Sequence, residues 1–268
     1  MPFPDFSAVP FDRLLDVSTR RVVITGGLRG LGFAIAARFA EGGASVLLTD
    51  MDGKGAQAAA AILQHLPGRT VGMALDATEP ADHDAAADFA MEHFGGLDVW
   101  VNNAGIFPSQ PILELTDIQW RHVVALNLDG VLYGCRAAGR AMRATGDGGC
   151  IINMSSTAGY KATSVGRAHY IAAKHGVIGL TKSVALEMAP YGIRSIALAP
   201  TFTATEGVAE RMGTKGAVDR AETFAAALPA GRVGLPDDVA RVALFCASPL
   251  AGYVTGVTIP VDGGDTAT

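Results

Sequence analysis

Cysteine, aromatic residues and charge are all scarce in this chain of 268 residues, and each shortage argues against a class of protein. The three cysteines, Cys135, Cys150 and Cys246, are odd in number and widely spaced, which predicts buried reduced thiols rather than a disulfide framework. The formal net charge is −5 and no basic tract is present, so a nucleic-acid partner is not expected. No apolar run approaches the ~18 residues that a membrane span needs.

Further absences bear on location and chemistry. The first residues contain acidic side chains and early prolines but no apolar core of a signal peptide, so we expect a cytoplasmic protein without membrane association. The histidines, at positions 65, 83, 93, 122, 169 and 175, form no metal-ligand spacing, and we expect no metal site. No linker rich in Ser and Pro, low-complexity tract or internal repeat interrupts the chain, which favours one domain.

Hydrophobic residues make up 49% of the chain, enough for a large packed core, and they follow two alternating patterns. Short, β-branched, almost wholly apolar runs are typical of a parallel sheet that is covered on both faces. Longer Ala-rich stretches between them suit helices. The expected strands are 21–25, 45–49, 70–75, 98–102, 150–155, 194–199 and 257–261, and the expected helices include 30–42, 53–65, 79–94, 116–144 and 167–190. This alternation predicts an α/β domain with a doubly wound, seven-stranded parallel sheet flanked by helices.

Two segments lie outside this alternation. Residues 1–20 are expected to form an N-terminal extension, which leaves 21–268 as the α/β domain. Residues 201–228 follow the sixth expected strand and are long enough for one or two helices over the sheet edge. We expect this segment to serve as a mobile lid over the substrate.

A glycine-rich loop, VVITGGLRGLG, joins the first expected strand directly to the first expected helix. Gly26 allows a tight turn, Gly30 lets the backbone approach a pyrophosphate, and Gly32 lets the helix pack close to the strand. The helix N-terminus adds amide donors and a positive dipole end for phosphate groups. A glycine cluster alone is weak evidence, but its place between strand and helix predicts a dinucleotide site that includes Arg29 and Leu31.

Polar residues stand at the ends of the next expected strands, where ligands of open α/β sheets bind. Asp50 ends the second strand, where a carboxylate can accept hydrogen bonds from the adenosine ribose and repel the extra phosphate of NADP. It could instead cap the following helix, and Arg29 could pair with a 2′-phosphate. We favour NAD over NADP. Asp76 ends the third strand, and Asn103 and Gly105 follow the fourth; each of these could also be a turn or cap residue.

The stretch HYIAAK, residues 169–174, places Tyr170 and Lys174 four residues apart in an expected helix, so the two side chains share one helix face. Such a pair is ordinary on a helix surface, as a half-buried aromatic ring beside a solvated lysine. Alternatively, the cation lowers the pKa of the phenol, normally ~10, until the phenol acts as an acid or base near neutral pH. The other motifs of the chain favour the second interpretation.

These motifs, in this order, resemble the short-chain dehydrogenase/reductase family over nearly the whole chain. The matching pieces are TGGLRGLG, the aspartate of LDAT, NNAG, ALNLDG, INMSS, YIAAK and the tail GRVGLPDDVA…YVTGVTIPVDGG. The resemblance implies a single Rossmann-type domain with Tyr170 as the catalytic acid/base and Lys174 as its partner. It also implies that Ser156 positions the substrate oxygen and that Asn127 holds a water that links Lys174 to solvent.

The resemblance also implies a set of cofactor contacts that runs across the sheet edge. Asp76 and Ala77 are expected to meet the adenine, and Asn103 to lie by the adenosine ribose. Thr203 and Thr205 are expected to meet the carboxamide of the nicotinamide. The cofactor implied by this set, together with Asp50, is NAD.

Two departures from the family pattern bear on the site. Many members have the serine 13 residues before the tyrosine, whereas Ser156 lies 14 residues before Tyr170 and Thr157 has the shorter spacing. We choose Ser156, because INMSSTAG aligns its second serine with the catalytic serine of the family. After the sixth strand the family usually has Pro-Gly, and this chain has Pro200-Thr201. Threonine tolerates a positive φ poorly, so we expect an altered local backbone and a reshaped substrate pocket.

The resemblance implies an NAD(H)-dependent oxidoreductase, assembled as a homotetramer, that interconverts a secondary alcohol and its ketone by hydride transfer. The substrate pocket is expected to include Ser156, Phe107, Tyr160 and Phe202, and its mostly apolar character favours a hydrophobic or cyclic alcohol. Two alternatives stay open. One is an NADPH-dependent 3-oxoacyl thioester reductase, against which Asp50 argues. The other is a non-catalytic NAD-sensing protein, against which the complete catalytic set argues.

Overall fold

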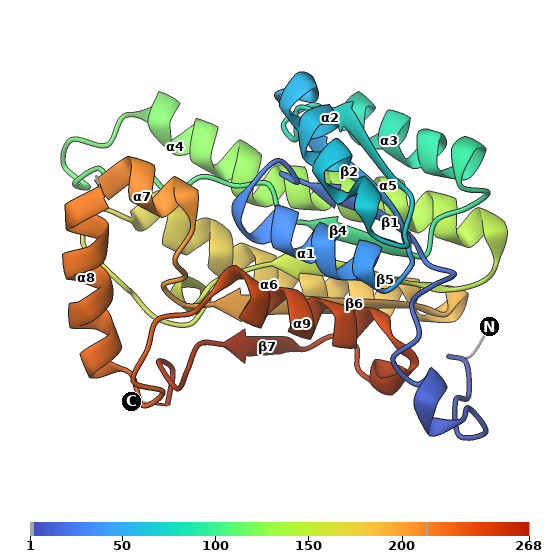
Figure 1. The fold of residues 1–268 in the computed structure, drawn as a ribbon. Helices are drawn as coiled ribbons and strands as arrows, with labels where there is room; N and C mark the ends of the chain where they lie inside the picture. The colour runs from blue at the N-terminus through green and yellow to red at the C-terminus, as the bar shows by residue number, and fades with distance from the viewer. Residues whose placement is uncertain (1–2, 213, 268) are drawn as a thin grey trace.

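Seven parallel strands form one sheet, in the order β3-β2-β1-β4-β5-β6-β7 (Figure 1). The structure, a computed structural model, describes residues 3–212 and 214–267. The strands are β1 Arg21–Thr25, β2 Ser45–Asp50, β3 Thr70–Ala74, β4 Val99–Asn102, β5 Gly149–Met154, β6 Ile193–Pro200 and β7 Thr258–Val261. The predicted seven-stranded parallel sheet is therefore confirmed, and each strand lies within one residue of its expected bounds.

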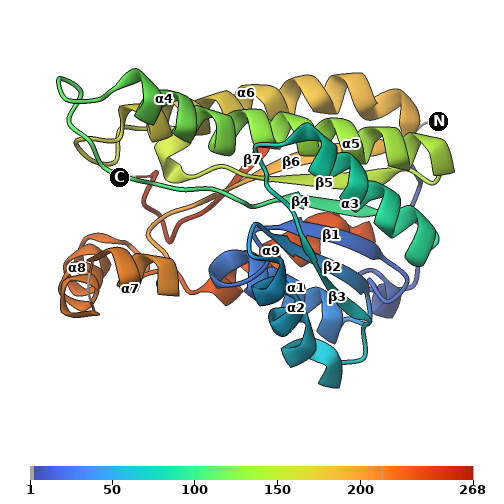
Figure 2. The same ribbon diagram turned by 90° about the horizontal axis from the view of Figure 1, so that it is seen from above.

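Helices cover both faces of the sheet, as right-handed crossovers require (Figure 2). One face carries α1 Gly30–Glu41, α2 Gly53–Ile62 and α9 Pro236–Ala247, and the other carries α3 Pro80–His93, α5 Gly130–Thr145 and α6 Ala168–Met188. The remaining helices are α4 Asp117–Val124, α7 Glu206–Met212 and α8 Thr214–Ala227. Among the described residues, no helix combines the length and the apolar composition that crossing a membrane requires.

The core is divided into two layers by the sheet itself. Val22 and Ile24 of β1 pack in one layer with Phe39 of α1, whereas Val23, between them in sequence, packs in the other layer with Trp100 of β4. Because successive side chains of a strand point to opposite faces, both faces must be apolar when helices cover both. This explains why the strand sequences are nearly continuous apolar runs.

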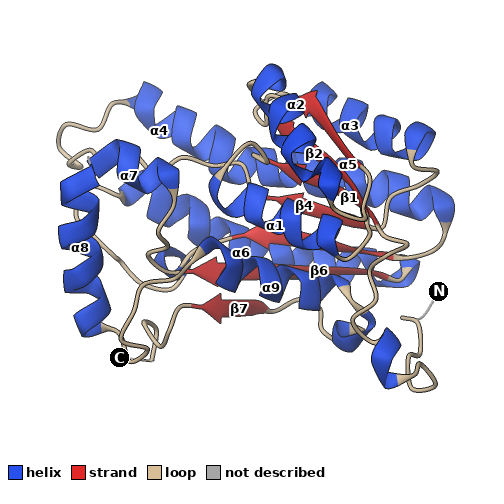
Figure 3. Cartoon of the chain, viewed as in Figure 1, coloured by secondary structure: helices blue, strands red, loops and turns tan. Residues whose placement is uncertain are grey.

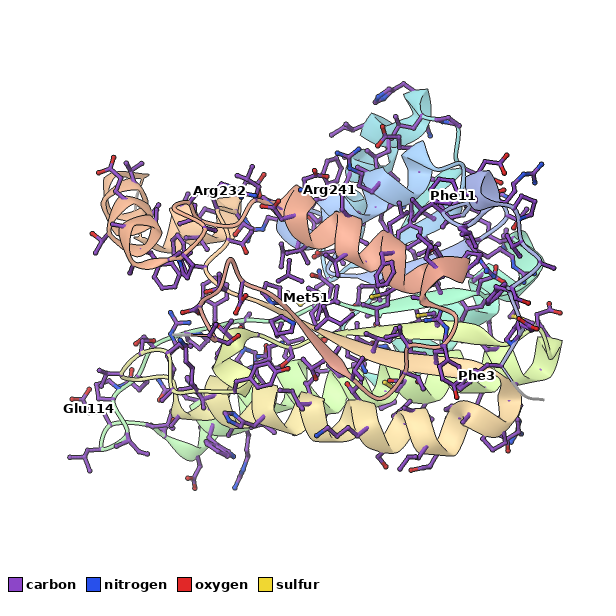
Figure 4. All side chains as sticks on the ribbon, turned by 90° about the horizontal axis from the view of Figure 1, so that it is seen from below. Phe3, Phe11, Met51, Glu114, Arg232 and Arg241 are labelled. Atoms are coloured by element: carbon purple, nitrogen blue, oxygen red, sulfur yellow. The ribbon has the colours of Figure 1, made fainter. Side chains whose placement is uncertain are left out.

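The N-terminal segment packs across the sheet end that lies away from α7 and α8 (Figure 1). Val17 is buried in the core layer of α1, and the backbone N–H of Leu250 donates to the carbonyl oxygen of Leu14 at 3.2 Å. Phe11, in the short turn Phe11–Arg13, is 89% exposed (Figure 4). The segment thus adds packing at the amino ends of the strands.

The long helix predicted over 116–144 is interrupted. α4 ends at Val124, a π-helical segment occupies Ala125–Asp129, and α5 begins at Gly130. The side-chain amide of Asn127 donates to the carbonyl oxygens of Val123, at 3.0 Å, and Ile106, at 2.9 Å. A side chain that bonds its own helix backbone in this way competes with the regular helix pattern. The prediction of one continuous helix was therefore wrong at this point.

The segment after β6 forms two helices, α7 and α8, beside the carboxyl ends of the strands (Figure 3). Within the described residues, positive φ angles occur at glycines alone, so Thr201 has an ordinary backbone. Thr201 therefore avoids the positive φ that threonine tolerates poorly. Instead, the Thr201 hydroxyl donates to the carboxylate of Asp265 in the C-terminal tail at 2.7 Å.

Candidate active site

A cavity of about 1510 Å³ lies at the carboxyl ends of the strands. It lies where β1 and β4 are neighbours, with β2 and β3 to one side and β5, β6 and β7 to the other. The direction of strand order reverses between β1 and β4, and ligands of open α/β sheets bind at such a point. α7 and α8 flank this end of the sheet and contribute Gly207, Val208 and Phe224 to the cavity wall (Figure 2).

The glycine loop forms one end of the cavity. Gly26 and Gly30 have φ angles of +64° and +59°, a conformation that glycine adopts without strain. A Cβ atom on Gly32 would lie 2.1 Å from the carbonyl oxygen of Gly26, so no larger residue fits between α1 and the loop. The side-chain amide of Asn103 donates to the carbonyl oxygens of Thr25 and Gly26, each at 2.9 Å. These contacts hold a cradle at the N-terminus of α1 that fits a pyrophosphate.

Asp50 ends β2, half-buried in the cavity wall. Its carboxylate accepts from the backbone N–H of Asp52 at 3.2 Å. The residue that caps α2 is Asp52, whose carboxylate accepts from the backbone N–H of Gly55 at 3.0 Å. The alternative role of Asp50 as the helix cap is therefore excluded, and its carboxylate is available to a ligand in the cavity.

Arg29 links the glycine loop to α7. Its guanidinium donates to the carboxylate of Glu210 at 2.5 Å, with side chains that are 52% and 62% exposed. An exposed ion pair of this kind contributes ~1 kcal/mol or less, so Arg29 can exchange Glu210 for another anion at small cost. Arg29 also lines the cavity, beside the loop that fits the phosphates.

The loop after β3 forms a fixed wall. The backbone N–H and the hydroxyl of Thr78 donate to the Asp76 carboxylate, at 2.9 and 2.7 Å, and these hydrogen bonds hold its pKa below the ordinary value. Nε2 of the buried His83 donates to the carbonyl oxygen of Ala77 at 3.1 Å. Leu31 and Ala77 both line the cavity. Their apolar surfaces beside a fixed turn suit a flat ring such as adenine.

Ser156, Tyr170 and Lys174 lie together at the other end of the cavity. The side chain of Ser156, which follows β5, lies close enough to the Tyr170 phenol to lower the pKa of that phenol by hydrogen bonding. The ammonium of Lys174 lies 5.6 Å from the centroid of the Tyr170 ring and donates to the carbonyl oxygen of Met154 at 2.7 Å. Thr157 also lines the cavity, but Ser156 is the hydroxyl that meets Tyr170. The geometry therefore supports the choice of Ser156 over Thr157.

The pKa values of the pair differ from the expectation that Lys174 lowers the pKa of Tyr170. Burial raises the pKa of the Tyr170 phenol above its ordinary value, against the Ser156 hydrogen bond and the positive charge of Arg167, which lower it. Burial also lowers the pKa of Lys174 to about 8, because the ammonium is 4% exposed. A lysine that loses its charge so easily contributes less to stabilising a phenolate than the sequence spacing suggests.

Asn127 lies in the π-helical segment behind these residues. It is fully buried, and its side-chain oxygen has no hydrogen-bond partner among the described residues. A Cβ atom on Gly105 would lie 2.6 Å from that oxygen, so glycine keeps the space beside it open. Buried polar atoms are nearly always satisfied, by protein or by ordered water. The arrangement fits the water-holding role that the family resemblance implies.

Aromatic rings line the remaining wall of the cavity. The Phe107 ring meets the Tyr170 ring edge to face, with centroids 6.4 Å apart. Phe202, after β6, packs against Phe224 of α8, with centroids 5.6 Å apart. These rings give part of the wall an apolar surface, and two of the predicted pocket residues, Phe107 and Phe202, belong to it.

Tyr160 is the exception among the predicted pocket residues. Its ring is 45% exposed, and its hydroxyl donates to the carbonyl oxygen of Thr258 in β7 at 3.2 Å. It does not belong to the cavity wall. The loop turns this ring toward the edge strand, which the local sequence does not indicate.

Thr203 and Thr205 line the cavity between the glycine loop and the aromatic wall. The buried Thr203 donates to the carbonyl oxygen of Thr201 at 3.0 Å. Thr205 precedes α7, where its hydroxyl accepts from the backbone N–H of Val208 at 3.4 Å. A Cβ atom on Gly30 would lie 3.6 Å from the Thr205 side chain, so the start of α7 lies opposite the glycine loop.

Lys161, Arg167 and Asp265 are among the charged residues of the cavity that the sequence did not single out. Lys161 pairs with Asp265 at 3.0 Å, and Thr201 donates to the same carboxylate. The guanidinium carbon of Arg167 lies 5.9 Å from the centroid of the Tyr170 ring. Arg167 stands three residues before Tyr170, a spacing that could have identified it. Asp265 comes from the C-terminal tail, and no local pattern indicates its position.

No group of three or more His, Cys, Asp or Glu side chains in residues 3–212 and 214–267 could hold a metal ion. The cysteines Cys135, Cys150 and Cys246 are buried and free, as predicted. Burial raises the pKa of the Cys135 and Cys246 thiols to about 12. None of the three belongs to the cavity wall.

The chain is similar to known proteins over most of its length. The family model described as "Enoyl-(Acyl carrier protein) reductase" matches residues 26–266. An oxidoreductase of Mycobacterium bovis is 41% identical over 253 residues, which are 92% of this chain and 97% of the relative. A 3beta-hydroxysteroid dehydrogenase of Eggerthella lenta is 38% identical over 244 residues, 90% of this chain and 93% of the relative. The crystal structure of a short-chain type dehydrogenase/reductase from Mycobacterium marinum is 32% identical, with a TM-score of 0.89 and coverage of 95% and 98%.

Proposed function

The chain belongs to the short-chain dehydrogenase/reductase family, and we propose that it is an NAD(H)-dependent oxidoreductase that interconverts a hydrophobic or cyclic secondary alcohol and its ketone. One observation carries this proposal: a single cavity joins the glycine loop, at one end, to Ser156, Tyr170 and Lys174 at the other. A dinucleotide that extends along this cavity brings its reactive end to the phenol.

The chain's own residues account for cofactor binding. Gly26, Gly30 and Gly32 leave the space that a pyrophosphate needs at the N-terminus of α1. Asp50 would accept hydrogen bonds from the adenosine ribose, and Asp76 with Ala77 would border the adenine. A bound nicotinamide would supply the acceptor for a hydride from the carbinol carbon, or the donor of a hydride to the ketone.

Proton transfer falls to Tyr170. In alcohol oxidation its phenolate takes the hydroxyl proton while the hydride leaves the carbinol carbon, and in ketone reduction the phenol returns that proton to oxygen. Ser156 lines the cavity beside Tyr170, and its hydroxyl would donate to the substrate oxygen. Lys174 has donors beyond its bond to Met154, and these are available to the cofactor ribose or to a water held by Asn127.

Preference for NAD over NADP rests on Asp50. A free carboxylate at the end of β2 repels the phosphate that NADP carries on the same ribose. Arg29 acts in the opposite direction, since its guanidinium lines the same cavity and is held by an exposed pair with Glu210. We assign the dominant effect to Asp50, because its carboxylate is half-buried at the end of β2, whereas the Arg29 side chain is 52% exposed and its attraction for an anion is weakened by solvent.

The substrate proposal rests on the aromatic wall. Phe107, Phe202 and Phe224 present apolar surface next to Tyr170, which suits a hydrophobic or cyclic alcohol. The relative from Eggerthella lenta is named for a hydroxysteroid, a cyclic secondary alcohol. We further propose that residues 201–228, including α7 and α8, act as the lid over this substrate.

A second candidate is the NADPH-dependent reduction of a 3-oxoacyl thioester. The description of the matching family model, which names an acyl carrier protein reductase, favours it. Two features distinguish the candidates: Asp50 disfavours NADPH, and a phosphopantetheine-borne substrate requires a path for a long chain out of the cavity. Turnover of acetoacetyl thioester with NADPH, at a higher kcat/KM than any alcohol with NAD, would decide for the reductase.

We also propose that the protein is a cytoplasmic homotetramer. Large apolar side chains stand exposed outside the cavity, among them Ile118 of α4 at 78%, Leu186 of α6 at 79% and Tyr253 before β7 at 94%. Subunit interfaces of a homotetramer would cover such side chains. Light scattering coupled to size-exclusion chromatography measures the subunit number; a monomer at micromolar concentration contradicts this proposal.

The test of function is steady-state reduction of NAD and, separately, of NADP across linear, cyclic and polyol secondary alcohols. The expected result is turnover with NAD that is greatest for an apolar cyclic alcohol and falls at least ~1000-fold in the Tyr170→Phe variant. Tight NAD binding without turnover of any alcohol or ketone would instead support a sensor. Calorimetric NADH titration of the variant controls for folding, since the variant should still bind the cofactor.

A further inference from the structure

Arg167 places a cation on the substrate side of the cavity, next to the reacting groups. It immediately precedes α6, and its guanidinium carbon lies 5.5 Å from the centroid of the Phe107 ring and 5.9 Å from that of Tyr170. The side chain is half-buried in the cavity wall. A guanidinium between two rings is held against their faces, which fixes its orientation before a substrate arrives.

The backbone that carries Arg167 is also held in place. Gly166 has a φ of +74°, and a Cβ atom there would lie 2.7 Å from the Ser109 hydroxyl. The backbone N–H of Gln110 donates to the carbonyl oxygen of Gly166 at 2.8 Å. This bond ties the loop before α6 to the loop between β4 and α4, whose outer end carries Glu114 (Figure 4). The backbone next to Arg167 is therefore fixed by a hydrogen bond to a neighbouring loop.

The other charges of this wall compensate one another. The Lys161 ammonium lies 3.0 Å from the carboxylate of Asp265, which also accepts from Thr201 at 2.7 Å. The Lys161 ammonium is a point charge, whereas the Arg167 guanidinium is a planar fork of donors that matches a carboxylate. Arg167 has further contacts of its own within the chain, but its five N–H donors allow it to bind a carboxylate in addition to them.

We propose that Arg167 is a specificity-determining residue that binds a carboxylate on the substrate, so that the substrate is a hydroxy acid or oxo acid with an apolar body. The inference rests on the proposed function and narrows its substrate class. Tyr170 follows Arg167 by three residues, and the guanidinium carbon lies 5.9 Å from the centroid of the Tyr170 ring, so the two side chains are neighbours in the cavity. The carboxylate then lies within a few bonds of the carbinol carbon, and the aromatic wall of Phe107 and Phe202 covers the body between them.

The test compares kcat/KM for charged substrates and their uncharged analogues, with NAD as the cofactor. The charged substrates are 3- and 4-(1-hydroxyethyl)benzoate, and the uncharged analogues are their methyl esters. In the wild type, kcat/KM should be at least ~10-fold higher for the better acid than for its ester. Arg167→Met should remove this preference by raising KM for the acid ~10–100-fold relative to KM for the ester. Arg167→Lys, which keeps the charge, should recover part of the preference.

The ratio of acid to ester isolates the recognition of charge, because any effect of Arg167 on the Tyr170 phenol is common to both substrates. Arg140→Met is the matched control: Arg140 lies on α5, outside the cavity, in an exposed pair with Asp84, and its loss should leave the ratio unchanged. An unchanged ratio in Arg167→Met, or a wild type that prefers every ester, overturns the proposal.

A binding experiment separates failure of this proposal from failure of the proposed function. Calorimetric titration of 4-acetylbenzoate and its methyl ester into the NADH-bound wild type should give a Kd at least ~10-fold lower for the acid, and Arg167→Met should abolish the difference. If no alcohol is oxidised at all, the dehydrogenase proposal fails while this titration still decides the role of Arg167. Equal Kd values for acid and ester refute that role even if neutral alcohols turn over.

Discussion

Replacing Asp50 by serine should convert the cofactor preference. Two unit charges 4 Å apart interact by ~4 kcal/mol at an effective dielectric constant of 20 and by ~1 kcal/mol in water. Asp50 is half-buried at the rim of an open cavity, so an intermediate value of about 2 kcal/mol is appropriate. Its removal should then raise kcat/KM with NADP ~30-fold. Loss of a ribose hydrogen bond should lower kcat/KM with NAD ~3–10-fold.

The structure indicates that Asp50→Ser changes the cofactor site without disturbing the neighbouring helix α2. The cap of α2 is Asp52, so Asp50→Ser leaves the helix N-terminus intact and should change stability little. The assay is kcat/KM for both cofactors at a fixed saturating alcohol, and the expected change in the NADP/NAD ratio is about 100-fold. Asp52→Asn, which keeps a capping side chain, is the control and should change the ratio less than threefold. A similarly small change in Asp50→Ser, with NAD binding intact, would refute the assignment of this carboxylate.

Three further predictions concern the glycine loop and the catalytic residues. Gly32→Ala should weaken NADH binding at least ~100-fold in a fluorescence titration, because the alanine Cβ would lie 2.1 Å from the carbonyl oxygen of Gly26. The control is Gly179→Ala in α6, where the new Cβ would have no atom within 4 Å. This variant should bind NADH normally and gain ~0.4–1 kcal/mol of stability. The free energy of unfolding should rise by up to ~3 kcal/mol between pH 8 and 10.5. Lys174 has a pKa of about 8 in the folded protein and 10.5 in the unfolded chain, so the unfolded chain binds more protons in this pH range. Urea titrations of the Lys174→Met variant should lack this rise. Ser156→Ala should shift the alkaline rise of kcat/KM for alcohol oxidation to higher pH, because the Ser156 hydrogen bond lowers the pKa of Tyr170; an unchanged midpoint contradicts this.

The fold could be predicted because its signals are local. A strand covered on both faces must be apolar at every position, and the runs around Val22 and Val23 show this directly. The role of the glycine loop could also be predicted from the sequence. Gly26 and Gly30 both have positive φ angles, and a side chain on Gly32 would have no room. The helical spacing of Tyr170 and Lys174 placed both side chains in the same cavity.

What the sequence did not reveal depends on tertiary contacts. The π-helical break arises because Asn127 bonds to Ile106, on a different loop. The raised pKa of Tyr170 follows from burial, which no spacing reports. Tyr160 turns to Thr258, far along the chain. Thr201, which stands where the family usually has glycine, donates its hydroxyl to the carboxylate of Asp265. That carboxylate comes from the C-terminal tail and lies near Thr201 only in the folded protein.

The most direct test of the central claim is to follow the hydride itself. The secondary alcohol with the highest turnover would be prepared with deuterium on its carbinol carbon and incubated with NAD and the wild-type protein. The mass of the reduced cofactor would then be measured by mass spectrometry. The account predicts NADH that carries one deuterium, formed by the wild type and absent with Tyr170→Phe. Unlabelled NADH, or labelled NADH formed equally well by the variant, would contradict the proposal that this cavity transfers a hydride under the control of Tyr170.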